Sequence, residues 1–92
     1  MRVLVRAFAK FREMAGEESA IDLEEGSTLC DLLEAVARAN PEIGDDLFTP
    51  EGGIGDGVTI LLNRKGIDLS NPGKTVLEEG DEVALLPPFS GG

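Results

Sequence analysis

The sequence predicts an α+β fold in which a mixed sheet of four to five strands packs on one main helix. Segments near both ends alternate between apolar and polar side chains, as strands do. One central segment carries a single apolar stripe at helical spacing, so it should cover one face of a sheet. The length of 92 residues fits one domain.

The first predicted elements are two strands joined by a short helical turn. Residues 2–8 form the first strand, and its inward face comprises Val3, Val5 and Ala7. Residues 9–15 favour a short helical turn that ends at Gly16. Alternation returns over residues 19–23 and predicts a second strand that pairs with the first.

The clearest helix signal follows Gly26. Thr28 and Asp31 have the spacing of a capping box, in which each side chain accepts a hydrogen bond from the other residue's backbone. One helical face then carries an apolar stripe of Leu29, Leu32, Leu33, Val36 and Ala37. Asn40-Pro41 ends the helix, because the residue before proline avoids helical backbone angles.

The second half of the chain is expected to begin with an irregular segment and to continue with strands. Residues 41–57 are interpreted as irregular, with Leu47-Phe48 as an anchor to the core. Residues 58–63 predict a buried strand, and residues 67–69 predict a short edge strand after a turn. Residues 82–86 predict the last strand, with Val83 and Leu85 inward.

This element order is that of the β-grasp, or ubiquitin-like, fold. Because the helix crosses over between the two groups of strands, the first and last strands should be parallel neighbours at the centre of the sheet. Residues 1–87 are assigned to the β-grasp domain, and residues 88–92 to a flexible C-terminal Gly-Gly tail.

Composition excludes several classes of function. The chain has 18 acidic and 8 basic residues, a net charge of −10, which argues against nucleic acid as a partner. It has no histidine and one cysteine, Cys30, so we expect no metal site, disulfide or histidine-based triad. No apolar run approaches the length of a membrane span, and residues 1–9 lack the core of a signal peptide. We expect a cytoplasmic protein.

The last residues carry the chemistry. Pro87-Pro88 should turn the chain out of the sheet, because proline cannot donate to the strand ladder. Gly91 and Gly92 have no side chains, so they fit a narrow channel. A terminal carboxylate becomes reactive once ATP converts it to an acyl adenylate, and either a sulfur nucleophile or an amine can then attack it. The activating groups must come from another protein.

Two segments resemble the ThiS/MoaD family of ubiquitin-like sulfur carriers, which includes the small subunit of molybdopterin synthase and the small archaeal modifier proteins. Residues 8–13 are similar to the family's segment after the first strand, and residues 80–92 to its C-terminal signature. The resemblance implies that an adenylating enzyme of the ubiquitin-activating type uses ATP and magnesium to adenylate Gly92. A sulfur donor then forms a thiocarboxylate, and the sulfur passes to a precursor of the molybdenum cofactor inside the large synthase subunit. This chain would bind no cofactor and act as a non-catalytic cosubstrate.

A partner-binding surface is expected on the sheet face away from the helix. Apolar residues on an exposed face of an acidic chain suggest a docking site. The candidates are Phe8, Leu61, Ala84 and Leu86, together with Pro87, Pro88 and Phe89 along the exit of the tail.

Three other functions stay open. A ubiquitin-like modifier would be joined through Gly92 to lysines of target proteins. An inert β-grasp binding module would function without Gly91 and Gly92. Sulfur carriage for the thiamin thiazole would use the same terminal chemistry with a different acceptor.

Overall fold

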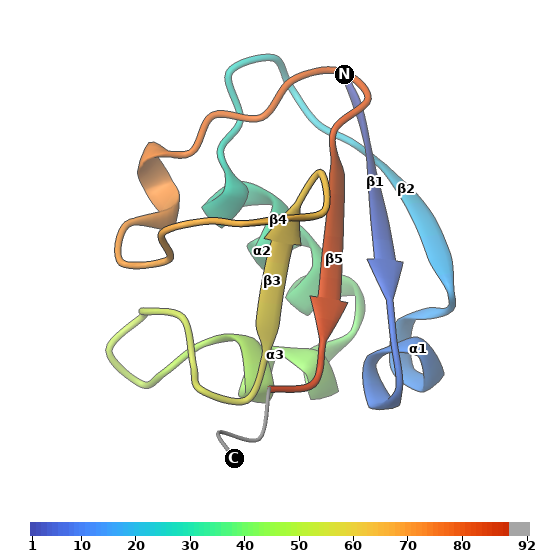
Figure 1. Cartoon of the computed structure of the whole chain (residues 1–92), viewed down its shortest axis with the longest axis vertical. Coiled ribbons are helices and arrows are strands. Elements are labelled where there is room, and N and C mark those ends of the chain that lie inside the picture. Colours follow the sequence, from blue (N-terminus) through green and yellow to red (C-terminus); the bar gives the residue numbers. More distant parts are fainter. Residues whose placement is uncertain (89–92) are drawn as a thin grey trace.

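The computed structural model describes residues 1–88, which contain five strands, three α-helices and one short 3₁₀ helix. In chain order these are β1 (Arg2–Ala7), α1 (Lys10–Ala15), β2 (Glu18–Asp22), α2 (Leu29–Ala39), α3 (Pro41–Leu47), β3 (Thr59–Leu62), β4 (Lys65–Gly66), η1 (Pro72–Lys74) and β5 (Glu82–Leu86). Figure 1 shows α2 lying behind the sheet, so the molecule has two layers.

The strands form one sheet in the order β2-β1-β5-β3-β4. β1 and β5, the first and last strands, are parallel neighbours at its centre, and the other pairs are antiparallel. The α+β, β-grasp prediction is therefore confirmed, including the crossover that brings the two ends of the domain together.

The core lies between the sheet and α2. Thr28 and Asp31 form the predicted capping box, with the Thr28 N–H donating to Asp31 Oδ2 at 2.8 Å and the Asp31 N–H to Thr28 Oγ1 at 3.3 Å. The largest fully buried side chains come from the sheet and from all three α-helices of residues 1–88: Phe11, Leu29, Leu32, Leu33, Ile43, Leu47, Leu85, Val3 and Val83. The predicted inward faces of the first and last strands are thus confirmed.

Two details of the predicted chain path are wrong. Residues 41–47 are the helix α3 rather than irregular, because Pro41 occupies its first turn and Ile43 and Leu47 bury the same face. The edge strand β4 covers residues 65–66 instead of 67–69, because Asn63 and Arg64 make the turn with positive φ angles.

The single cysteine, Cys30, lies on α2. It is half-buried on α2 and stands outside the core cluster. Its Sγ lies 3.9 Å from Glu34 Oε1, and burial, reinforced by Glu34 and Asp31, raises the pKa of the thiol. A raised pKa leaves little reactive thiolate at neutral pH.

No helix within residues 1–88 combines the length and the apolarity that crossing a bilayer requires. The same part of the chain contains no cluster of three or more histidine, cysteine or acidic side chains placed to hold a metal ion.

Candidate functional site

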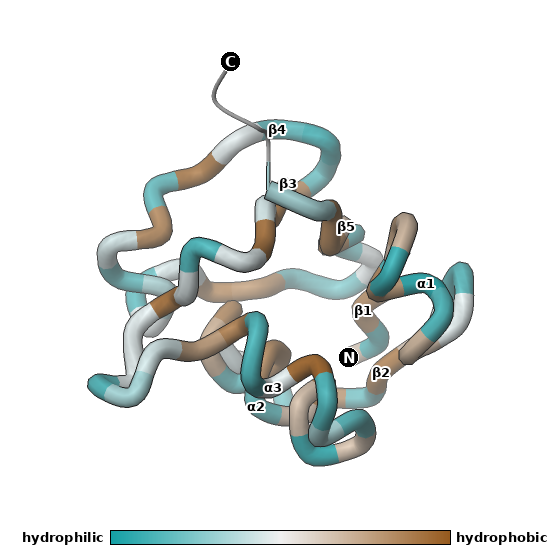
Figure 2. Tube along the Cα trace, turned by 90° about the horizontal axis from the view of Figure 1, so that it is seen from below, coloured by the Kyte–Doolittle hydropathy of each residue, from teal (hydrophilic) through white to brown (hydrophobic). Residues whose placement is uncertain are grey.

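The sheet has one face covered by α2 and one open face, and the open face is the candidate site. Seen end-on in Figure 2, β1, β5 and β3 lie to one side of α2 and α3. Successive strand residues point to opposite faces, so the residues between the buried positions make the open face. We define the open face by the central-strand residues Leu4, Arg6, Phe8, Thr59, Leu61, Glu82, Ala84 and Leu86.

An apolar patch of Phe8, Leu61, Ala84 and Leu86 occupies one half of the open face. Leu61 pairs with Ala84, and Leu86 pairs with Thr59, in the β3–β5 ladder. The Phe8 N–H donates to the carbonyl of Leu85 at 3.0 Å, which places Phe8 beside the end of β5. Phe8 is one of two large apolar residues that are exposed among residues 1–88, and 40% of its surface is accessible to solvent. The structure therefore brings four predicted site residues together, but Ala84 is buried, so Phe8, Leu61 and Leu86 supply the accessible apolar surface.

A charged row crosses the open face beside the apolar patch. Arg6 Nε lies 3.9 Å from Glu18 Oε2, and Arg6 Nη1 lies 4.0 Å from Glu82 Oε1. Arg64 Nε lies 3.6 Å from the same Glu82 oxygen. The Arg6 guanidinium also stands 5.9 Å from the centroid of the Phe8 ring, which joins the row to the apolar patch.

Sequence reasoning does not find this charged row. Its members lie far apart in the chain, and only the strand register brings them together. Arg6 pairs with Glu18 on β2 and with Ala84 on β5, and Glu82 lies on the same face two residues before Ala84. The alternation of β1 does place Arg6 outward, so a correct register prediction is the signal that would reveal the row.

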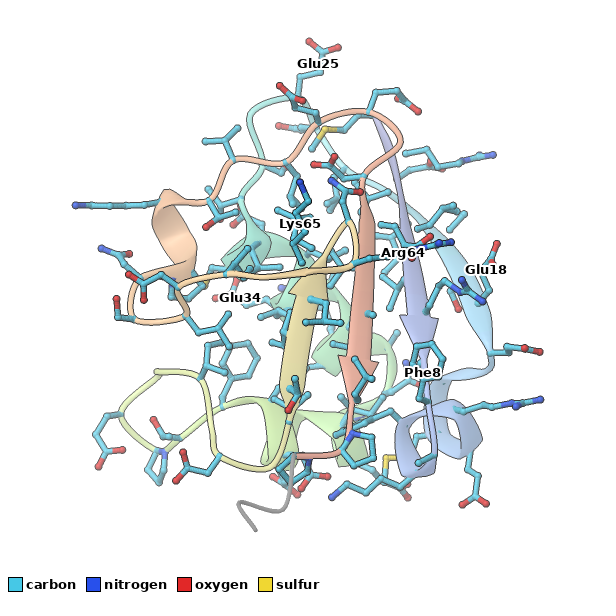
Figure 3. The ribbon with its side chains drawn as sticks, viewed as in Figure 1. Phe8, Glu18, Glu25, Glu34, Arg64 and Lys65 are labelled. Carbon is cyan, nitrogen blue, oxygen red and sulfur yellow. The ribbon has the colours of Figure 1, made fainter. Side chains whose placement is uncertain are left out.

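The chain leaves the sheet where the sequence predicts. β5 ends at Leu86, Pro87 is half-buried, and Pro88 is exposed. This exit lies at the end of the sheet where Phe8 and the apolar patch are found (Figure 3). The remaining predicted site residues, Phe89, Gly91 and Gly92, lie outside the described residues, as does all of the predicted tail except Pro88.

Comparisons with known proteins give full-length matches. The sequence profile of the ThiS family matches residues 5–92. Small archaeal modifier protein 1 from Haloferax volcanii is 32% identical over 88 residues, which cover 95% of this chain and 97% of that protein. A molybdopterin synthase sulfur carrier subunit from Chlamydomonas reinhardtii is 34% identical over 93 residues, which cover 100% of both chains.

Solved structures extend the likeness to three dimensions. The crystal structure of SAMP1 from Haloferax volcanii has a TM-score of 0.82 at 30% identity and covers 100% of both chains. A chain in the complex of subunits 1 and 2 of the molybdopterin-converting factor from Helicobacter pylori has a TM-score of 0.64 at 28% identity, again over 100% of both chains. Structural relatives therefore include a protein that assembles with a second subunit.

Proposed function

Because this chain belongs to the ThiS family of ubiquitin-like proteins, we propose that it carries sulfur as a thiocarboxylate on Gly92 and delivers it in molybdopterin biosynthesis. The observation that carries the proposal is the full-length likeness to a protein named as a molybdopterin synthase sulfur carrier subunit. The match of the family profile extends to Gly92 itself, so it includes the residue that would be modified.

The proposed chemistry needs only a free carboxylate on Gly92. A carboxylate oxygen attacks the α-phosphorus of ATP on an adenylating enzyme with magnesium, and pyrophosphate leaves. Hydrosulfide from a sulfur donor then attacks the carbonyl carbon, so that a C–S bond forms and the C–O bond to AMP breaks. Glycine favours this attack because no side chain crowds the carbonyl. This chain supplies no cofactor site and no catalytic side chain in the scheme.

The apolar patch would dock the partner proteins while the tail reaches their active sites. The patch borders the exit of the chain at Pro87, so a partner covering it would lie next to Pro87 and Pro88. We propose two such partners, the adenylating enzyme and the large subunit of molybdopterin synthase. The Helicobacter pylori complex supports the second, since a chain of this fold is seen there with its subunit 2.

A second candidate function is that of a ubiquitin-like protein modifier. The likeness to small archaeal modifier protein 1 favours it, at an identity similar to that of the sulfur carrier subunit. Both functions begin with adenylation of Gly92. They differ in the next acceptor, which is sulfur in the first case and a lysine amine of a target protein in the second.

Reconstitution tests the sulfur-carrier proposal. The purified chain is incubated with its adenylating enzyme, ATP, magnesium and sulfide, and is then added to the large subunit and the molybdopterin precursor. We expect sulfur-containing product from the wild-type chain and none from a variant lacking Gly92. A thiocarboxylated chain that delivers no sulfur to the large subunit would contradict the proposed acceptor.

The docking role of the apolar patch has its own test. Leu61→Asp and Leu86→Asp place a carboxylate within the patch, where a partner would have to bury it unpaired. We expect both variants to fold and to lose binding to the large subunit. Unchanged binding would show that the partner docks elsewhere.

A further inference from the structure

We propose that Arg6 and Arg64 form a carboxylate-binding pair on the open face, which receives an acidic side chain of the docked partner protein. The proposal rests on the proposed function, because it describes the surface on which the large subunit would dock. It adds a polar, orienting contact to the apolar patch. Four observations on the charged row support it.

The first observation is that the arginines are more exposed than the acid between them. The Glu82 side chain is 21% exposed, whereas that of Arg6 is 33% and that of Arg64 is 78% exposed. Glu82 is shared by the two guanidinium groups, and Arg6 also lies 3.9 Å from Glu18, whose side chain is 54% exposed. Arg64 is therefore the guanidinium at the outer end of the row. The Arg64 end of the row therefore presents positive charge outward, although the chain as a whole carries −10.

The second observation is that the guanidinium groups are not engaged by hydrogen bonds. Within residues 1–88 neither Arg6 nor Arg64 donates one, and their ion-pair distances to Glu82 are 4.0 and 3.6 Å. Arg6 Nε is also buried without an acceptor. Reorienting either side chain toward an incoming carboxylate thus breaks no hydrogen bond, and arginine can grip a carboxylate through two parallel N–H groups.

The third observation is the backbone of Arg64. Asn63 and Arg64 have φ angles of 52° and 69°, the left-handed conformations of a two-residue hairpin turn. Glycine is the favoured second residue of such a turn, and arginine there carries a steric cost. Positions that retain such a cost are concentrated at functional sites.

The fourth observation is that this turn is fastened to β5. The Asn63 side-chain amide donates to Asp81 Oδ1 at 3.0 Å, and its carbonyl accepts from the Glu82 N–H at 3.0 Å. Arg64 consequently starts from a fixed position beside Glu82. Figure 3 shows its side chain reaching from the turn across β5 toward β1.

These features define the kind of partner. Arg6 lies in register with Ala84, and Ala84 with Leu61, so the charged row and the apolar patch form one continuous surface. The matching surface is an apolar area bordered by an aspartate or glutamate. The guanidinium pair would fix the orientation of the partner, because like charges opposed to it would be repelled.

Binding of the large subunit of molybdopterin synthase from the same organism tests the proposal. Dissociation constants are measured for the wild-type chain and for Arg6→Gln, Arg64→Gly and Glu82→Gln. We expect each arginine variant to bind about tenfold more weakly and with a smaller dependence on salt. Glu82→Gln should bind more tightly, because the guanidinium groups lose their internal partner.

Control variants separate binding from folding and from net charge. Arg38→Gln removes the same charge from the last turn of α2, away from the open face, and should leave affinity unchanged. Arg64→Gly creates the favoured Asn-Gly turn, so its weaker binding cannot be attributed to unfolding. Arg6→Lys retains the charge without the planar fork and should bind between wild type and Arg6→Gln.

Affinities of both arginine variants equal to that of Arg38→Gln would overturn the proposal. Weaker binding by Glu82→Gln would also overturn it, since the partner would then contact the central carboxylate. Failure of the proposed function looks different, because the wild-type chain itself would not bind the large subunit, and the arginine proposal would then fail with it.

Discussion

Ala9 adopts a backbone conformation that usually requires glycine. Its φ and ψ are 52° and −126°, at the point where the chain turns from β1 into α1. The carbonyl of Ala9 accepts hydrogen bonds from the N–H groups of Arg12 and Glu13, at 3.0 and 3.3 Å, so the first turn of α1 holds this conformation in place. A non-glycine residue in such a region costs on the order of 1–3 kcal/mol.

Ala9→Gly should therefore stabilise the fold. The side chain is exposed, so removing it loses little burial. Relief of the strain raises the free energy of unfolding, and the greater flexibility of glycine in the unfolded chain offsets part of this gain. We expect a net rise of about 1 kcal/mol. Urea denaturation measures the change. Gly16→Ala is the opposite control, since Gly16 has a φ of 88° and alanine there should lower stability. Equal or lower stability of Ala9→Gly would show that the turn is not strained.

Arg2 and Asp22 make a pH-dependent contact at the first strand pair. Arg2 Nε donates to Asp22 Oδ1 at 3.1 Å, and this hydrogen bond, together with the positive charge, lowers the pKa of the Asp22 carboxyl below its ordinary value. A lowered pKa means that the contact stabilises the fold above the ordinary aspartate pKa of about 3.9. That stabilisation is lost as the pH falls through the lower pKa of the folded state.

Arg2→Gln should raise the pKa of Asp22 toward its ordinary value. An NMR titration of the carboxyl carbons measures it directly. Asp68 serves as an internal control, because hydrogen bonds from Ser70 lower its pKa and do not involve Arg2. An unchanged Asp22 titration in the variant would show that the guanidinium does not contact this carboxyl in solution.

At the level of elements, the capping box sets the start of α2. The Thr28 hydroxyl accepts from the Asp31 N–H, and loss of such a cap costs about 1 kcal/mol. We expect Thr28→Ala to lower the free energy of unfolding by that amount, and Thr28→Ser, which keeps the hydroxyl, to remain close to wild type. Thermal or urea unfolding distinguishes them. Equal losses in both variants would assign the effect to the methyl group of Thr28 instead.

The elements that the sequence predicts well are those with a complete local signal. The capping box and the five-residue stripe define α2, and alternation defines β1 and β5, because in each case burial on one face imposes the pattern. Helix α3 carries a weaker signal. Pro41 and Gly44 are typical of loops, and only Ile43 and Leu47 bury its face.

Tertiary contacts explain what local patterns miss. Gly44 permits α3 to approach α2, since a Cβ at that position would lie 3.3 Å from Ala37 Cβ. The β3–β4 turn at Asn63-Arg64 has the left-handed geometry of an Asn-Gly turn without the glycine, so the short edge strand is predicted too late in the chain. The first feature depends on a residue of the preceding helix, and the turn is held by Asp81 and Glu82, 18 and 19 residues along the chain from Asn63.

The candidate site likewise has one part that local patterns predict and another part that depends on how the strands pair. Alternation along three strands suffices to place Phe8, Leu61, Ala84 and Leu86 outward. The charged row of Arg6, Glu18, Glu82 and Arg64 requires the register of four strands and the turn geometry as well. A pattern within one strand can indicate which face is open, but the pairing of strands determines which charges meet there.

At the scale of the whole molecule, the hydrophobic core and the candidate site lie on opposite faces of the sheet. Residues within 1–88 form the core between α2 and the sheet. The open face borders the point at Pro87 where the chain leaves the sheet. A carrier of this design would hold its partner with the sheet and present its reactive end beyond it. Although the chain is acidic overall, the Arg64 side chain beside the open face is 78% exposed.

The most direct test of the sulfur-carrier account is the intact mass of the protein from its native cells, with fragmentation of the C-terminal peptide. The account predicts a fraction in which one oxygen is replaced by sulfur, located at Gly92. Gly92 joined instead to lysines of other proteins would favour the modifier function. A plain carboxylate, unchanged after incubation with ATP, the adenylating enzyme and a sulfur donor, would contradict the account.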